Sequence, residues 1–68
     1  MSKLVISRDK FIGILKAHSF YFKRQVASHQ SWEGMVDGKR RLVSVDMNYK
    51  AYSGWLLNSM IRQSGLLK

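Results

Sequence analysis

The stretch HQSWEGMVDGKRRLVSV, residues 29–45, decides the fold of this chain. Asp37-Gly38 near its middle predicts a tight hairpin turn, because both residues tolerate the positive backbone angles that two-residue turns require. The turn is expected to join a strand over residues 29–35 to a second strand over residues 39–45. Both strands show the alternation of a sheet with one buried face.

Alternation also sets the faces of these two strands. If Trp32 packs inward, His29 lies on the solvent face, whereas a one-residue bulge between them would reverse this arrangement. In the strand after the turn, Arg40 shares a face with Leu42, and Arg41 shares the opposite face with Val43. One of the two arginines must therefore reach the open side of the sheet.

Two helices are predicted outside the hairpin. Ser7 is a suitable N-cap, and the apolar spacing that follows predicts a first helix over residues 8–17. Leucine, methionine and isoleucine side chains at 56, 57, 60 and 61 form the stripe of a second helix, which begins at Ser53 or Gly54 and ends before Gly65.

The segments between these elements are less regular. Residues 20–24 alternate as a further strand, with Phe20 and Phe22 expected in the core. Residues 25–28 are expected to form a turn. Residues 46–53 are interpreted as a loop.

The order helix, strand, strand, strand, helix predicts an α+β fold. Such an order gives a three-stranded antiparallel sheet with both helices on one face and the other face open to a ligand. This is the arrangement of a double-stranded-RNA-binding-like fold. A chain of 68 residues is expected to form one domain, residues 1–68, with little room for an enclosed site.

Composition points to a polyanionic partner. The chain has 12 basic and 4 acidic residues, a formal charge of +8, so nucleic acid or an acidic protein is the expected partner. Cysteine is absent, and the histidines and acids show no ligand spacing, so neither a metal nor another cofactor is expected. No apolar run approaches the roughly 20 residues that span a bilayer, and no signal peptide is evident. We therefore expect a cytoplasmic protein without membrane contact.

The segment Arg24-Gln25-Val26-Ala27-Ser28-His29 carries the candidate chemistry. Imidazole can accept and donate a proton near neutral pH. A histidine that follows Lys23 and Arg24 could therefore cleave RNA held by the basic surface. The other histidine, His18, falls at the end of the first predicted helix, where a cation is favoured, and we interpret it as structural.

From residue 7 to residue 66 the chain resembles the HicA family of messenger-RNA interferase toxins. The resemblance rests on the segment 24–29, which is similar to Arg-Gln-x-Gly-Ser-His, on the Asp37-Gly38 hairpin and on the strand Val43-Ser44-Val45. It continues through Gly54-Trp55-Leu56 and Ile61-Arg62-Gln63-Ser64-Gly65-Leu66, which match the motifs of the family's last helix.

The resemblance implies a toxin of a type II toxin-antitoxin system, a metal-independent endoribonuclease that cleaves messenger RNA and is inhibited by a HicB-type antitoxin. The family's catalytic histidine falls on His29. Its RNA-facing positions fall on six residues: Lys23, Arg24, Ser28, Lys39, Arg40 and Arg41. The cations among them are candidates to stabilise the transition state, and water, Glu33 or a tyrosine would complete the proton transfers.

The chain departs from the family pattern at three positions. Ala27 replaces the usual glycine, Gln30 replaces a second histidine and Ser44 replaces a proline. Because alanine does not readily take a left-handed backbone angle, the approach to His29 is expected to differ from the family's.

Two other functions fit the same residues. A non-catalytic RNA-binding module would need the basic surface but no histidine chemistry. A small DNA-binding regulator is the weaker alternative, because the second predicted helix offers few base-reading side chains. Tyr49, Tyr52 and Trp55 either pack against the core or form a stacking or docking surface.

Overall fold

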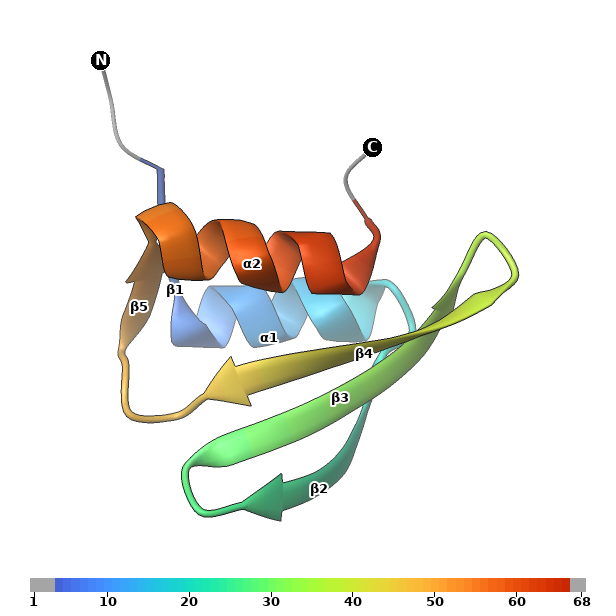
Figure 1. Ribbon diagram of the computed structural model, residues 1–68, viewed down its shortest axis with the longest axis horizontal. Helices are drawn as coiled ribbons and strands as arrows, with labels where there is room; N and C mark the ends of the chain where they lie inside the picture. The colour runs from blue at the N-terminus through green and yellow to red at the C-terminus, as the bar shows by residue number, and fades with distance from the viewer. Residues whose placement is uncertain (1–3, 67–68) are drawn as a thin grey trace.

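The computed structural model describes residues 4–66. In chain order its elements are β1 (Val5–Ser7), α1 (Arg8–Ala17), β2 (Tyr21–Val26), β3 (His29–Val36), β4 (Lys39–Asp46), β5 (Ala51–Ser53) and α2 (Gly54–Ser64). The fold is a small α+β arrangement, as the order of predicted elements indicated (Figure 1).

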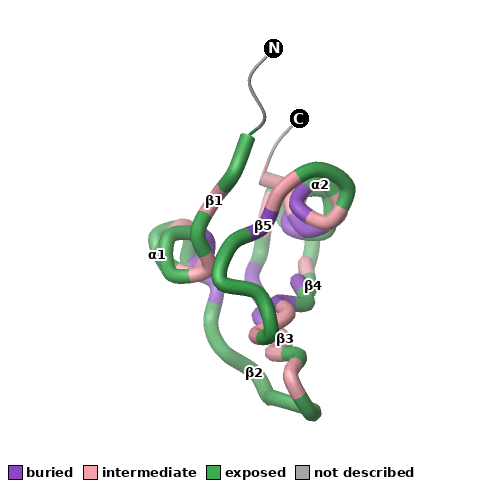
Figure 2. The backbone as a smooth tube through the Cα atoms, turned by 90° about the vertical axis from the view of Figure 1, so that its left-hand side faces the viewer, coloured by how far each residue is buried: buried purple, intermediate pink, exposed green. Residues whose placement is uncertain are grey.

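The main sheet has three antiparallel strands in the order β2-β3-β4, with β3 in the middle. Both helices lie over one face of this sheet, and the other face is left uncovered (Figures 1 and 2). The three strands, their direction and the side on which the helices lie are as predicted.

The Asp37-Gly38 turn closes the β3–β4 hairpin as expected. Both residues have positive φ, 53° for Asp37 and 77° for Gly38. Because the turn has two residues, Val36 pairs with Lys39, and the register then continues without a shift to the far end of the hairpin.

The two predicted helices are confirmed with their ends. Ser7 Oγ accepts a hydrogen bond from the Lys10 amide at 3.2 Å, which satisfies one of the free N–H groups at the start of α1. At the end of α2, Gly65 adopts the left-handed angle of a C-terminal cap, with φ of 68°.

The core lies between the helices and the covered face of the sheet (Figure 2). Its buried apolar residues are Phe11, Leu15, Phe20, Trp32, Val43, Val45, Tyr52, Leu57 and Met60. Gly34 leaves space for the Phe20 ring, because a Cβ added there would lie 2.7 Å from Phe20 Cγ. The prediction for Phe22 was wrong: this residue is half exposed on the edge strand β2, where its ring makes a T-shaped contact with the Trp32 ring.

The segment between β4 and α2 also differs from its prediction. Residues 51–53 form β5, which pairs with β1 as an antiparallel two-stranded ribbon rather than continuing a loop. Tyr52 pairs with Ile6 in this ribbon and is fully buried, whereas Tyr49 and Trp55 remain exposed. Burial of the Tyr52 ring, edge-on to Phe11, is what attaches the ribbon to the core.

One edge of the main sheet is partly covered by a side chain of α2. The Ser44 amide in β4 donates to Gln63 Oε1 at 3.1 Å. This N–H points away from β3, so it would otherwise remain an unpaired donor at the sheet edge.

An apolar cavity of about 300 Å³ lies on the helix side of the fold. Its walls include Ile14, Ile61 and Leu66, and none of the predicted site residues lines it. Within residues 4–66 neither helix has the length and apolar character needed to cross a bilayer.

Candidate functional site

His29 lies on the uncovered face of the sheet at the first position of β3. Its neighbour across the hairpin is Asp46 and its neighbour on the other side is Val26. Trp32 points to the helices, so alternation places His29 toward solvent, and its side chain is 57% exposed. The solvent-facing alternative predicted for His29 is therefore the correct one.

A carboxylate lies beside the imidazole. His29 Nε2 is 3.6 Å from Asp46 Oδ2, while the Asp46 side chain is only 20% exposed. A carboxylate in this position can orient the imidazole ring. Across residues 4–66, no other carboxylate forms an ion pair with His29.

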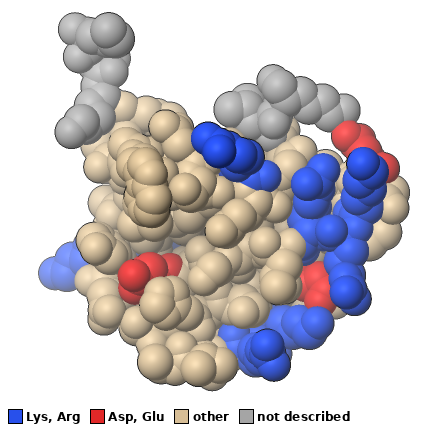
Figure 3. All heavy atoms as spheres, viewed as in Figure 1, with Lys and Arg blue, Asp and Glu red and all other residues tan. Residues whose placement is uncertain are grey.

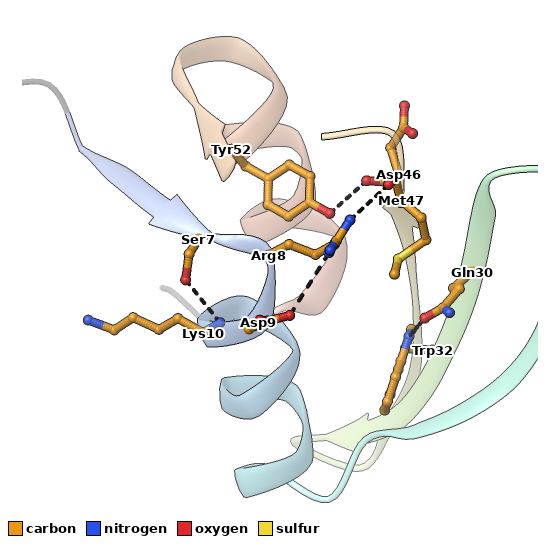
Figure 4. A network of polar contacts seen from close by, with 9 residues as sticks. All are labelled: Ser7, Arg8, Asp9, Lys10, Gln30, Trp32, Asp46, Met47 and Tyr52. Carbon is orange, nitrogen blue, oxygen red and sulfur yellow. Dashed lines mark hydrogen bonds and ion pairs between the residues drawn. The ribbon is translucent and has the colours of Figure 1, made fainter. Parts of the chain in front are cut away.

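Asp46 is fixed by hydrogen bonds to both its side chain and its backbone. Oδ1 accepts from the Asn48 amide at 3.0 Å. The backbone carbonyl accepts from the Tyr52 hydroxyl at 2.7 Å, as Figure 4 shows. Burial raises the pKa of the Tyr52 phenol, with Asp46 adding to the rise and Arg8 opposing it. The hydroxyl therefore stays protonated and keeps donating at physiological pH.

The segment that follows Asp46 is hydrogen-bonded to two other parts of the chain. Met47 N donates to the Ser28 carbonyl at 2.7 Å, and Asn48 Nδ2 donates to Ser28 Oγ at 3.0 Å. On its other side, Arg8 NH1 donates to the Met47 carbonyl at 2.9 Å (Figure 4). Ser28, expected to face RNA, has its hydroxyl occupied as an acceptor within the fold.

The turn before His29 contains a backbone strain that was not expected. Ala27 adopts φ of 54°, the left-handed angle that alanine was predicted to avoid. The two-residue connection between β2 and β3 imposes this angle, and Gln25 Nε2 supports it by donating to the Ala27 carbonyl at 3.0 Å. The prediction that Ala27 would not take this angle was therefore wrong.

Arg24 is the cation best placed to act with His29. It pairs with Ser31, two positions along β3 from His29, so the two side chains are diagonal neighbours on the same face. Diagonal neighbours lie about 7–8 Å apart at their backbones, within reach of an arginine side chain. Among the described residues, the Arg24 side chain has no ion pair or hydrogen bond.

Glu33 lies in the centre of the same face, where two of the predicted RNA-binding cations surround it. Lys23 Nζ is 2.8 Å from Oε1, and Arg40 Nε is 3.6 Å from Oε2. The hydrogen bond from Lys23 lowers the pKa of Glu33, so this carboxylate is ionised at neutral pH. Four strand positions separate Glu33 from His29, about 13 Å at the usual rise, too far for Glu33 to be the second proton-transfer group.

The basic residues of the hairpin lie on both faces and at the end remote from His29. Arg41 points to the helices and packs against Gly65, where an added Cβ would lie 2.6 Å from Arg41 Nε. Lys39 and Arg40 are exposed beside the turn, and Figure 3 shows Lys and Arg side chains gathered on this side of the molecule. The seven steps from His29 to Val36 span about 23 Å, so these cations do not contact a group that reacts at His29.

Sequence reasoning missed Asp46 as part of this site. The hairpin register could have identified it. A two-residue turn at Asp37-Gly38 pairs residue 36 with residue 39, and counting outward along both strands then pairs residue 29 with residue 46. Over residues 4–66 no cluster of three or more His, Cys, Asp or Glu side chains is suited to hold a metal ion.

Comparisons of the chain with protein-family models, with curated proteins and with solved structures found no match.

Proposed function

We propose that this protein is an endoribonuclease toxin of the HicA type, with a double-stranded-RNA-binding-like fold, in which His29 carries the proton transfer. The observation that carries the proposal is the position of His29: exposed on an uncovered sheet face, 3.6 Å from a carboxylate and diagonal to Arg24. A proton-transfer group and a cation that stabilises developing negative charge both assist cleavage of a ribose-phosphate bond without a metal.

The proposed reaction begins with removal of the ribose 2′-hydroxyl proton by the neutral imidazole of His29. The 2′-oxygen forms a bond to phosphorus while the bond from phosphorus to the 5′-oxygen breaks. Arg24 stabilises the negative charge on the phosphoryl oxygens. The leaving oxygen takes a proton from water, and the hydroxide so formed is neutralised by the proton on His29, giving a 2′,3′-cyclic phosphate and a 5′-hydroxyl.

Messenger RNA in the cytoplasm is the proposed substrate, and a HicB-type antitoxin is the proposed inhibitor. Support for both comes from the uncovered face, which combines Arg24, Lys23 and Arg40 with exposed Tyr21 and Leu42. Cations and exposed apolar groups on one face suit a single-stranded nucleic acid or an acidic protein. An adjacent reading frame for a small antitoxin-like protein would strengthen the proposal of an inhibitor.

The test compares His29→Ala with His18→Ala, which removes the other histidine at the exposed end of α1. With a labelled messenger RNA in the presence of EDTA, we expect His29→Ala to lower the cleavage rate by roughly a hundredfold or more. His18→Ala should cleave at the wild-type rate, and both variants should bind RNA. A folded His29→Ala protein with full activity would refute the catalytic role.

A non-catalytic RNA-binding module is the second candidate. It is favoured by one observation: the other of the two histidines, His18, lies at the end of α1, so the uncovered face holds no second histidine for the leaving group. Salt-sensitive binding by the wild-type protein without any cleaved product would support this function instead.

A further inference from the structure

We propose that Asp46 is a positioning residue that keeps the proton of the neutral His29 ring on Nε2 and so presents Nδ1 to the substrate. The catalytic consequence of this proposal rests on the proposed function. Its structural part, the position of the imidazole proton, can be measured in the absence of RNA.

The geometry assigns the two nitrogens different roles. Nε2 is the ring atom that faces Asp46 Oδ2, at 3.6 Å. This separation is slightly longer than a hydrogen bond, and at this distance the negative carboxylate still favours the tautomer whose N–H points toward it. A neutral imidazole carries one N–H, which leaves Nδ1 with a free lone pair. Nδ1 is then the atom that can take the 2′-hydroxyl proton.

The carboxylate can act in this way because its own position is fixed. Oδ1 is occupied by the Asn48 amide at 3.0 Å, which leaves Oδ2 as the oxygen directed to His29. The Tyr52 hydroxyl holds the backbone of the same residue at 2.7 Å. A freely rotating aspartate would lose most of its preference for one ring nitrogen, whereas a fixed one retains it.

Among residues 4–66, the charged and polar groups near His29 do not compete for this role. Glu33, the other carboxylate on the uncovered face, is about 13 Å along the strand and is held by Lys23 and Arg40. Arg24 is a cation and cannot accept a hydrogen bond. Asn48 Nδ2 and Ser28 Oγ are hydrogen-bonded to each other.

The decisive variant is Asp46→Asn, which keeps the shape of the side chain. The amide oxygen must still accept from the Asn48 amide, so the NH₂ group takes the place of Oδ2 and faces Nε2. Two donors cannot face each other, so the neutral ring should move its proton to Nδ1. The same reasoning explains why an asparagine that replaces the aspartate of a serine-protease triad inactivates its histidine.

The experiment records nitrogen-15 spectra of the imidazole groups at a pH where His29 is neutral. We expect the Nε2–H form in the wild-type protein and a shift toward the Nδ1–H form in Asp46→Asn. Asp37→Asn is the matched control, because it removes the same charge at the opposite end of the hairpin and leaves an Asn-Gly turn. It should leave the His29 signals unchanged, and His18 should be unchanged in all three proteins.

Cleavage assays on the same proteins provide the second measurement. We expect kcat of Asp46→Asn to fall roughly two- to fivefold, the range for a partly exposed ion pair, with KM unchanged and partial recovery in Asp46→Glu. An unchanged tautomer in Asp46→Asn, or an equal loss of kcat in Asp37→Asn, would overturn the positioning role. If the wild-type protein cleaves no RNA, the proposed function fails, and the tautomer measurement still decides the role of Asp46.

Discussion

The two ends of the β3–β4 hairpin are built differently. At one end, Asp46 lies beside His29 and accepts a hydrogen bond from Tyr52, and the segment after it is hydrogen-bonded to Ser28 and Arg8. At the other end, about 23 Å away, Asp37-Gly38 closes a turn flanked by exposed Lys39 and Arg40. The candidate proton-transfer group and much of the basic charge are therefore far apart. We expect them to govern different steps, with the reaction at one end of the hairpin and the attraction of RNA at the other.

The largest expected effect separates these two roles. In the double variant Lys39→Gln/Arg40→Gln, we expect RNA affinity near 0.1 M salt to fall roughly tenfold and the salt dependence to flatten, because two cations no longer release counterions. The rate at saturating RNA should be unchanged, because neither residue contacts the reacting group. Binding titrations at several salt concentrations measure both quantities.

Arg41→Gln is the control for that variant. It removes one charge from the same strand, as Arg40→Gln alone does, but Arg41 faces the helices and packs against Gly65. RNA affinity should change less than twofold, in keeping with the long-range contribution of one screened charge. Equal loss of affinity in Arg40→Gln and Arg41→Gln would mean that RNA binding depends only on the net charge of the protein and not on the face of the sheet where the cation lies.

A smaller effect is expected from removing a hydrogen bond at the His29 end of the hairpin. Tyr52→Phe removes the hydroxyl that donates to the Asp46 carbonyl at 2.7 Å, and the free energy of unfolding should fall by about 1 kcal/mol. Tyr49→Phe, at an exposed ring, should change it by less than about 0.5 kcal/mol. Urea denaturation measures both variants, and an unchanged midpoint for Tyr52→Phe would show that the anchor contributes nothing to stability.

The smallest effect concerns the strained turn beside His29. Ala27→Gly should raise the free energy of unfolding by about 0.5 kcal/mol, because relief of the left-handed strain exceeds the added entropy of the unfolded chain. Ala17→Gly makes the same substitution in α1, where the angle is helical, and should instead lower stability by up to about 1 kcal/mol. If both variants changed stability in the same direction, the φ of 54° at Ala27 would not be a source of strain.

Much of the fold was predictable, because its signals are local. Asp37-Gly38 sets the hairpin, Ser7 and Gly65 set helix ends, and alternation sets the face of Trp32 and therefore of His29. The separation of Arg40 from Arg41 follows from the same alternation.

The ribbon of β1 and β5 was not predictable in this way. Each strand has three residues, too few to show a period, and their pairing joins parts of the chain more than forty positions apart. The Tyr52–Asp46 hydrogen bond depends on that pairing, so the anchoring of the site could not be read from local pattern. The His29–Asp46 pair is different, because the turn register alone was sufficient to find it.

The hydrogen bond from the Ser44 amide to Gln63 bears on how this protein meets copies of itself. A sheet edge with free N–H groups invites a strand from another molecule, which leads to domain swapping or aggregation. Because Gln63 already accepts the hydrogen bond from the Ser44 amide, a strand that adds at this position must first displace it. Self-association through this edge of the sheet is thereby made less favourable than it would be with a free Ser44 amide.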